Sequence, residues 1–183
     1  MAATLAFQLS GGASNADPNL SLGGVHSSVA LSATAMNNLF DDVAAGEASA
    51  GDTEYRAIDI TNTGDATSAV TKIFMDPETS STSTQLDMGI EASPLGSTLS
   101  IANESTAPAG VTFAHYNSGS NLSLPDIPAA AYCRVWVPRV VSAAAPHPST
   151  HTSTPHAAYT SYPTSPQSAP LMPSLWLSIS WGS

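Results

Sequence analysis

The stretch Ala130-Ala-Tyr-Cys-Arg-Val-Trp-Val137 has the clearest strand pattern in the chain. Successive side chains of a β-strand point to opposite faces, so a strand buried on one face shows a period of two. One alternating set is Cys133, Val135 and Val137, and the other is Tyr132, Arg134 and Trp136. We therefore predict a strand with an apolar face, on which Cys133, the single cysteine, is a buried small hydrophobic residue.

Similar short runs recur on both sides of this stretch, separated by Gly, Pro, Asn and Asp turn signals. They cover residues 4–10, 55–61, 70–75, 85–91, 98–102, 111–113, 122–124 and 175–181. No segment between them is long enough for the helix of a parallel crossover, which favours antiparallel pairing. The pattern predicts an all-β antiparallel sandwich, with a single helical turn over residues 34–43.

The apolar faces of the central runs predict one core. Its expected members are Ile58, Ile60, Ile73, Leu86, Met88, Ile90, Val135 and Val137.

Composition divides the chain into four parts. Residues 1–50 contain a strand, a Gly/Asn-rich arm and the helical turn, and residues 51–141 form the predicted sandwich body. Residues 142–173 are a Pro/Ser/Thr/His-rich extended arm, and residues 174–183 hold a closing or exchanged strand. The last 44 residues carry half of the 14 prolines and no charged residue, so the arm cannot build a core of its own.

Charge limits the classes of partner. The net charge of −10 comes from 14 acidic residues against four basic ones, which are Arg56, Lys72, Arg134 and Arg139. Such a balance disfavours nucleic-acid and anionic membrane partners, because few cations are available to neutralise phosphates. The N-terminus lacks the charged and apolar regions of a secretion signal, and we expect an unprocessed protein that is made inside the cell.

The two terminal strands are the predicted partner-binding elements. Residues 5–28 have too few apolar side chains to fold alone, so we expect another subunit to order them. The last strand either completes its own sheet or adds to a neighbour's. The predicted contact residues are Leu5, Phe7, Leu9, Leu175, Leu177, Ile179 and Trp181.

Candidate chemistry is sparse. The spacing of His147, His151 and His156 suits a helical metal site, but the intervening prolines disfavour that helix. The acidic cluster of Asp41, Asp42, Glu47, Asp52 and Glu54 could hold Ca²⁺, although a solvated face or a contact with a basic neighbour is favoured. We expect no cofactor and no enzymatic activity, because the sequence has no nucleophile elbow, phosphate loop or dinucleotide fingerprint.

Aromatic residues offer a further alternative. A platform that stacks on sugars could be built from Tyr132, Trp136, Trp176 and Trp181. Their aliphatic neighbours favour core or interface packing instead.

Four parts of the chain have distinctive runs. They are Leu9-Ser-Gly-Gly-Ala-Ser-Asn-Ala-Asp-Pro18 with Ser21-Leu-Gly-Gly24, Asn38-Leu-Phe-Asp-Asp-Val43 with Ala50-Gly-Asp-Thr-Glu-Tyr-Arg56, Ala102-Asn-Glu-Ser-Thr-Ala-Pro-Ala-Gly-Val-Thr-Phe113, and Val135-Trp-Val-Pro-Arg139. In combination these runs resemble small virion structural proteins of tailed bacteriophages. The resemblance covers residues 9–141 and implies an immunoglobulin-like body behind a Gly/Asn-rich segment. It supplies no catalytic residue, and the chain departs from the family's pattern after Val141.

The leading expectation is therefore a capsid decoration (cement) protein that bridges subunits of the head. It would be located in the virion, assembled in the host cytoplasm, in contact with the major capsid protein or neck and tail proteins, and homo-oligomeric in the particle. One alternative is a structural protein of the tail, neck or fibre attachment. The other is a carbohydrate-binding module that contacts the host surface.

Overall fold

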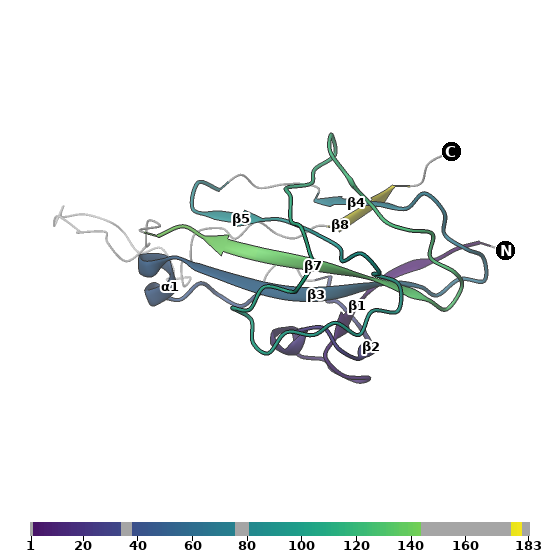
Figure 1. Ribbon diagram of the computed structural model, residues 1–183, viewed down its shortest axis with the longest axis horizontal. Helices are drawn as coiled ribbons and strands as arrows, with labels where there is room; N and C mark the ends of the chain where they lie inside the picture. The colour runs from purple at the N-terminus through teal and green to yellow at the C-terminus, as the bar shows by residue number, and fades with distance from the viewer. Residues whose placement is uncertain (1, 34–37, 76–80, 144–176, 181–183) are drawn as a thin grey trace, which may run out of the picture.

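A computed structural model describes residues 2–33, 38–75, 81–143 and 177–180 (Figure 1). The strands are β1 (Leu5–Ser10), β2 (His26–Ala30), β3 (Asp52–Asn62), β4 (Lys72–Met75), β5 (Thr84–Leu86), β6 (Leu122–Ser123), β7 (Tyr132–Val141) and β8 (Leu177–Ser180). A 3-10 turn, η1 (Pro18–Leu20), and a short helix, α1 (Ala45–Ala50), complete the described secondary structure. Neither of these helices is long and apolar enough to cross a bilayer.

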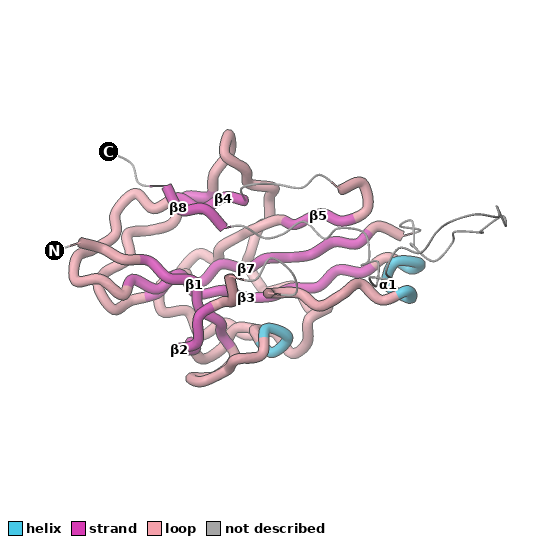
Figure 2. Tube along the Cα trace, turned by 180° about the vertical axis from the view of Figure 1, so that it is seen from behind, coloured by secondary structure: helices cyan, strands magenta, loops and turns pink. Residues whose placement is uncertain are grey.

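All pairing between the described strands is antiparallel, as the sequence predicts. One sheet has the order β2-β1-β3-β7-β5, and a second has the order β6-β4-β8. Figures 1 and 2 show β3 and β7 running along the length of the first sheet, with β4 and β8 together on one side of them. The outer strands of the first sheet are β2 and β5, while β6 and β8 are the outer strands of the second.

The pair β3–β7 is the longest element of the fold. Its register runs from Asp52 opposite Val141 to Thr61 opposite Tyr132 without a bulge. Both strands extend beyond the predicted ranges, β3 by three residues at its N-terminal end and β7 by four at its C-terminal end. Most of its residues are buried, because both faces of the pair are covered.

One face of β3–β7 covers the predicted core. Seven of the eight expected core residues are buried in a single cluster, and the eighth, Ile90, packs against it half-buried. Strands of both sheets contribute to this cluster, with Ile58 and Val135 from the first and Ile73 and Leu122 from the second. The core prediction is confirmed, and alternation identified it because these residues lie on one face of their strands.

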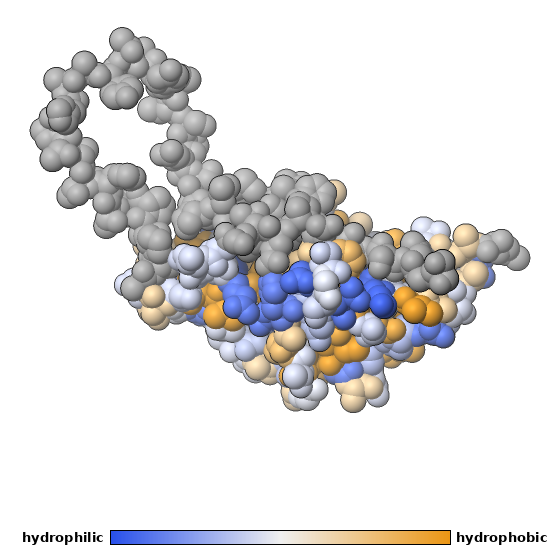
Figure 3. All heavy atoms as spheres, turned by 90° about the horizontal axis from the view of Figure 1, so that it is seen from above, coloured by the Kyte–Doolittle hydropathy of each residue, from blue (hydrophilic) through white to orange (hydrophobic). Residues whose placement is uncertain are grey.

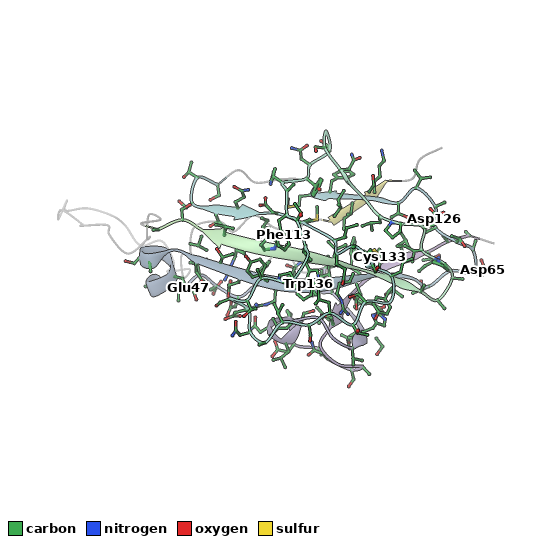
Figure 4. All side chains as sticks on the ribbon, in the orientation of Figure 1. Glu47, Asp65, Phe113, Asp126, Cys133 and Trp136 are labelled. Carbon is green, nitrogen blue, oxygen red and sulfur yellow. The ribbon has the colours of Figure 1, made fainter. Side chains whose placement is uncertain are left out.

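The opposite face of β3–β7 is also covered, but by loops. Trp136 is completely buried there and packs with Ala57 and Ile101. Figure 4 shows Trp136 and Phe113 in the middle of the molecule, away from its ends. The segments 98–102 and 111–113, expected as strands, are irregular. Their apolar side chains pack in the cluster around Trp136. Their backbone groups form isolated hydrogen bonds to other loops and no continuous ladder.

The N-terminal residues belong to the same sheet. Strand β1 lies between β2 and β3 and pairs with both. The loop between β1 and β2 is anchored at Gly23, whose φ of +84° and close approach to Trp136 and Leu99 leave no room for a Cβ. Strands β1 and β2, at the two ends of this segment, therefore pair within the chain's own first sheet. The predicted contact with another subunit stays a prediction.

The helical turn is displaced from its expected position. Within residues 38–43, the described part of the predicted turn, the chain bends without forming a helix, and α1 follows at Ala45–Ala50. Leu39 is buried in the core cluster and Phe40 packs against it. The apolar residues whose spacing suggested a helix, Leu39 and Phe40, thus pack in the core of the fold.

Replacing Ile60 by Ala should lower the free energy of unfolding by about 2–4 kcal/mol, because it removes burial and leaves a cavity. Ile60 is fully buried, whereas Leu20 is 57% exposed. The matched change Leu20→Ala should alter stability by no more than about 0.5 kcal/mol. Denaturant titration measures both, and equal losses would contradict this core.

Cys133 should report unfolding. Its side chain is buried, and burial raises the pKa of the thiol to about 12. At pH 8 only about one thiol in 10,000 is then the reactive thiolate. Iodoacetamide should modify the native protein only at the rate of global unfolding, measured by mass spectrometry. Rapid modification of the native chain would show that Cys133 is accessible.

Candidate functional site

The predicted contact residues of β1 are largely used inside the fold. Leu9 is buried, while Leu5 and Phe7 are half-buried and pack against the core cluster. Of these three residues, Leu5 and Phe7 are still partly accessible to a partner.

The predicted contact residues at the other end are described in part. Leu177 and Ile179 lie in β8, in register with Met75 and Ile73 of β4. Leu175 and Trp181 fall outside the described residues. Pairing with β4 of the same chain is the closed arrangement, and the burial of these side chains stays a prediction.

A buried ion pair joins β3 to β7 on the loop-covered face. Asp59 and Arg134 are direct cross-strand neighbours, and both side chains are fully buried. The pair is bidentate, with Arg134 Nε 2.8 Å from Asp59 Oδ1 and Arg134 Nη2 2.9 Å from Asp59 Oδ2. The remaining nitrogen, Nη1, donates to the carbonyl oxygens of Gly24 and Leu99, each at 3.0 Å. One guanidinium therefore fastens two separate loops to the sheet.

His26 completes this cluster from β2. Its Nδ1 lies 3.0 Å from Asp59 Oδ2, and its ring stacks on Tyr132 with centroids 4.5 Å apart. A carboxylate and the imidazole that it orients are also two of the three members of a catalytic triad. Among the described residues, however, no hydroxyl or thiol hydrogen-bonds to His26, and Asp59 already balances Arg134. The arrangement favours a structural role that holds β2 against the sheet.

A second ion pair joins the same strands on the core-facing side. Glu54 and Arg139 are cross-strand neighbours in direct contact, and both are buried. Arg139 also donates to the backbone carbonyl of Asp41. Phe40 lies beside two guanidinium groups, with its ring centroid 5.1 Å from Arg139 Cζ and 5.5 Å from Arg56 Cζ. Cation–π contacts of this kind add to the ion pairs when they are desolvated.

Burial shifts the titration of Glu54. Desolvation raises the pKa of its carboxyl above the ordinary value, although the neighbouring Arg139 and Arg56 oppose the shift. The folded chain therefore favours the protonated form more than the unfolded chain does. Ionisation of Glu54 lowers the stability of the fold as pH rises from the ordinary carboxyl pKa through the raised one.

Three residues of the predicted acidic cluster do converge. Carboxylate oxygens of Glu47, Asp52 and Glu54 lie within 4.8 Å of one another, which suits a hard cation such as Ca²⁺. Glu54 already binds Arg139, so its charge is balanced by a basic neighbour of the same chain. Asp41 and Asp42 are exposed. The cluster thus has two parts: Glu54 is buried in contact with Arg139, and Asp41 and Asp42 face the solvent.

The aromatic platform does not form as a unit. Trp136 is completely buried, and Tyr132 is half-buried against His26. Trp176 and Trp181 lie outside the described residues.

Burial of the arginines determines the charge of the surface. Arg56, Arg134 and Arg139 are all buried, which leaves Lys72, half-buried, as the remaining basic side chain. Several acidic residues of the described part are exposed, namely Asp17, Asp41, Asp42, Asp65 and Asp126. Figure 3 shows one face, where hydrophilic residues form a band with hydrophobic ones scattered beside it. The exposed charge of the described surface is therefore mainly negative, and this acidic surface is the candidate functional site.

Sequence reasoning missed the two cross-strand ion pairs. The available signal of buried charge was Arg56, which falls in the same alternating set as the buried Ile58 and Ile60, but its closest partner is Glu104, so it points to neither of these two pairs. A charged residue in an apolar set indicates a buried partner, because an unpaired charge is too costly to bury.

Comparison of the chain with protein-family models, with curated proteins and with solved structures gives no match.

Replacing Asp59 by Asn should cost about 3–5 kcal/mol of stability, because Arg134 is left buried without its counter-charge. The double change Asp59→Leu with Arg134→Leu should cost less than the two single changes added together, since neither charge then remains. The coupling energy comes from thermal and denaturant unfolding of four proteins: the unmodified chain, Asp59→Leu, Arg134→Leu and the double variant.

Asp126→Asn is the control for that series. Asp126 is exposed, so its loss of charge should change stability by no more than about 0.5 kcal/mol. A loss below about 1 kcal/mol for Asp59→Asn would show that the buried pair does not support the fold.

Proposed function

We propose that this protein is a structural component of a bacteriophage virion, and that it decorates the capsid. Its body is an immunoglobulin-like β-sandwich, in which the two sheets enclose the core cluster. Its role is adhesive: it covers junctions between capsid subunits and adds contacts that hold them together.

The burial of the three arginines is the observation that carries this proposal. Their ion pairs hold the chain's own strands and loops, so the described surface offers mainly carboxylates and neutral polar groups. Electrostatic complementarity then favours a protein partner that presents Lys and Arg. The same surface disfavours direct contact with packaged DNA, because it has few cations to replace phosphate counterions.

The arrangement of strands supports an assembly role. Each sheet ends in short outer strands, β2 and β5 in one and β6 and β8 in the other. Outer strands leave backbone groups available for pairing with another chain. The half-exposed Leu5 and Phe7 add apolar surface beside them. Main-chain pairing, limited apolar contact and acidic charge together suit a subunit held in a shell.

Purified particles of the phage that encodes this chain should contain it in hundreds of copies. Quantitative mass spectrometry against the major capsid protein measures the ratio directly. Particles disassembled into heads and tails should retain it with the heads.

Other outcomes identify the other roles. Tens of copies or fewer, retained with the tail, would indicate a tail, neck or fibre-attachment protein. Absence from particles combined with glycan binding by the isolated protein would indicate a carbohydrate-binding module. Either result would contradict capsid decoration.

A further inference from the structure

Strand β4 is paired mainly through β8. The register matches Lys72 with Ser180, Ile73 with Ile179, Phe74 with Ser178 and Met75 with Leu177. On its other side, β4 pairs with β6 over two positions only, Lys72 with Ser123 and Ile73 with Leu122. The place beside β4 is thus a strand-accepting site, occupied along the full length of β4 by the C-terminal strand.

The covalent connection to β8 is long. Thirty-five residues separate Val141, the end of β7, from Leu177, the start of β8. A connection of this length lowers the effective concentration of the tethered strand to the millimolar range or below. Closure within one chain therefore loses its advantage over the same pairing between two chains once the protein concentration approaches this value.

The donated segment is electrostatically neutral. All acidic residues lie between Asp17 and Asp126, and no charged residue follows Arg139. A chain of net charge −10 repels a second copy at its body, but its C-terminal segment can approach that copy without charge repulsion.

We infer that β8 is exchanged between copies of this chain: the site beside β4 accepts residues 177–180 of a second copy. Exchange reproduces every register pair of the closed form, so no new complementarity has to arise. Closed chains dominate in dilute solution, and exchanged chains accumulate as protein concentration approaches the effective concentration of the tether. This inference concerns the isolated chain and does not depend on the proposed function.

The register gives a direct test with two single variants, Lys72→Cys and Ser180→Cys. The two variants are mixed, unfolded under reducing conditions, refolded and then oxidised. A disulfide between positions 72 and 180 then joins two chains, and it is favoured where β8 of one chain lies on β4 of another. The yield of this link, identified by peptide mass spectrometry, should rise roughly in proportion to protein concentration from about 10 μM to about 1 mM. Cys133 is buried and should not compete after refolding.

Two matched proteins interpret the result. The double variant Lys72→Cys/Ser180→Cys, refolded at high dilution, should form the link within one chain, which shows that β8 occupies its site. Ser178→Cys replaces Ser180→Cys as the off-register control, because Ser178 lies opposite Phe74 rather than Lys72. It should give at least about tenfold less linked dimer, as expected where the register is specific.

Three outcomes would overturn the inference. No link between the mixed single variants at any concentration would show that β8 is never exchanged. No link in the double variant would show that β8 does not pair with β4. Equal yields from the on-register and off-register variants would show random collision instead of strand pairing.

Discussion

The register of β3 against β7 is fixed by two ion pairs on opposite faces of the same two strands. Asp59 lies opposite Arg134 on the loop-covered face, and Glu54 lies opposite Arg139 on the core-facing side. A slip of one residue would separate both pairs and turn each apolar set towards the wrong face. Apolar alternation alone specifies which face of each strand is buried. The ion pairs also specify which residue of β3 lies opposite which residue of β7. All other strands of the first sheet are placed by reference to this pair.

The same charges organise the irregular parts of the chain. Arg134 bonds the loop around Gly24 and the loop around Leu99, and Arg56 reaches Asn19 and Glu104 in the same two regions. Loops that cover a sheet face must satisfy backbone carbonyls without a ladder, and a guanidinium with five donors can satisfy several at once. Arginine side chains therefore supply hydrogen bonds to these loops that a further strand would supply in a more regular β protein.

This division explains what the sequence could predict. Alternation around Ile58, Ile60 and Val135 identified the core, because residues on one strand face need no knowledge of the partner strand. The loop-covered face was read incorrectly: Leu99, Ile101 and Phe113 have the spacing of strands, but their packing on Trp136 does not require strand pairing. Register and long-range ion pairs depend on residues about 75 to 85 positions apart, which local periodicity cannot connect. The contact residues of β1 were identified as apolar, yet their first partner proved to be the chain's own sheet.

Burial of the basic residues also governs how proteases meet this chain. Trypsin cleaves after Lys and Arg, and all four such residues lie within strands, at Arg56 in β3, Lys72 in β4, and Arg134 and Arg139 in β7. Three of them are inaccessible in the fold, and the fourth is held between paired strands. A protease must bind its substrate as an extended, unpaired segment, so we expect native chains to resist trypsin. The C-terminal 44 residues contain no Lys or Arg and therefore add no cleavage site. Digestion therefore separates folded from unfolded molecules in a mixture, and the large fragments it leaves report which strands opened first.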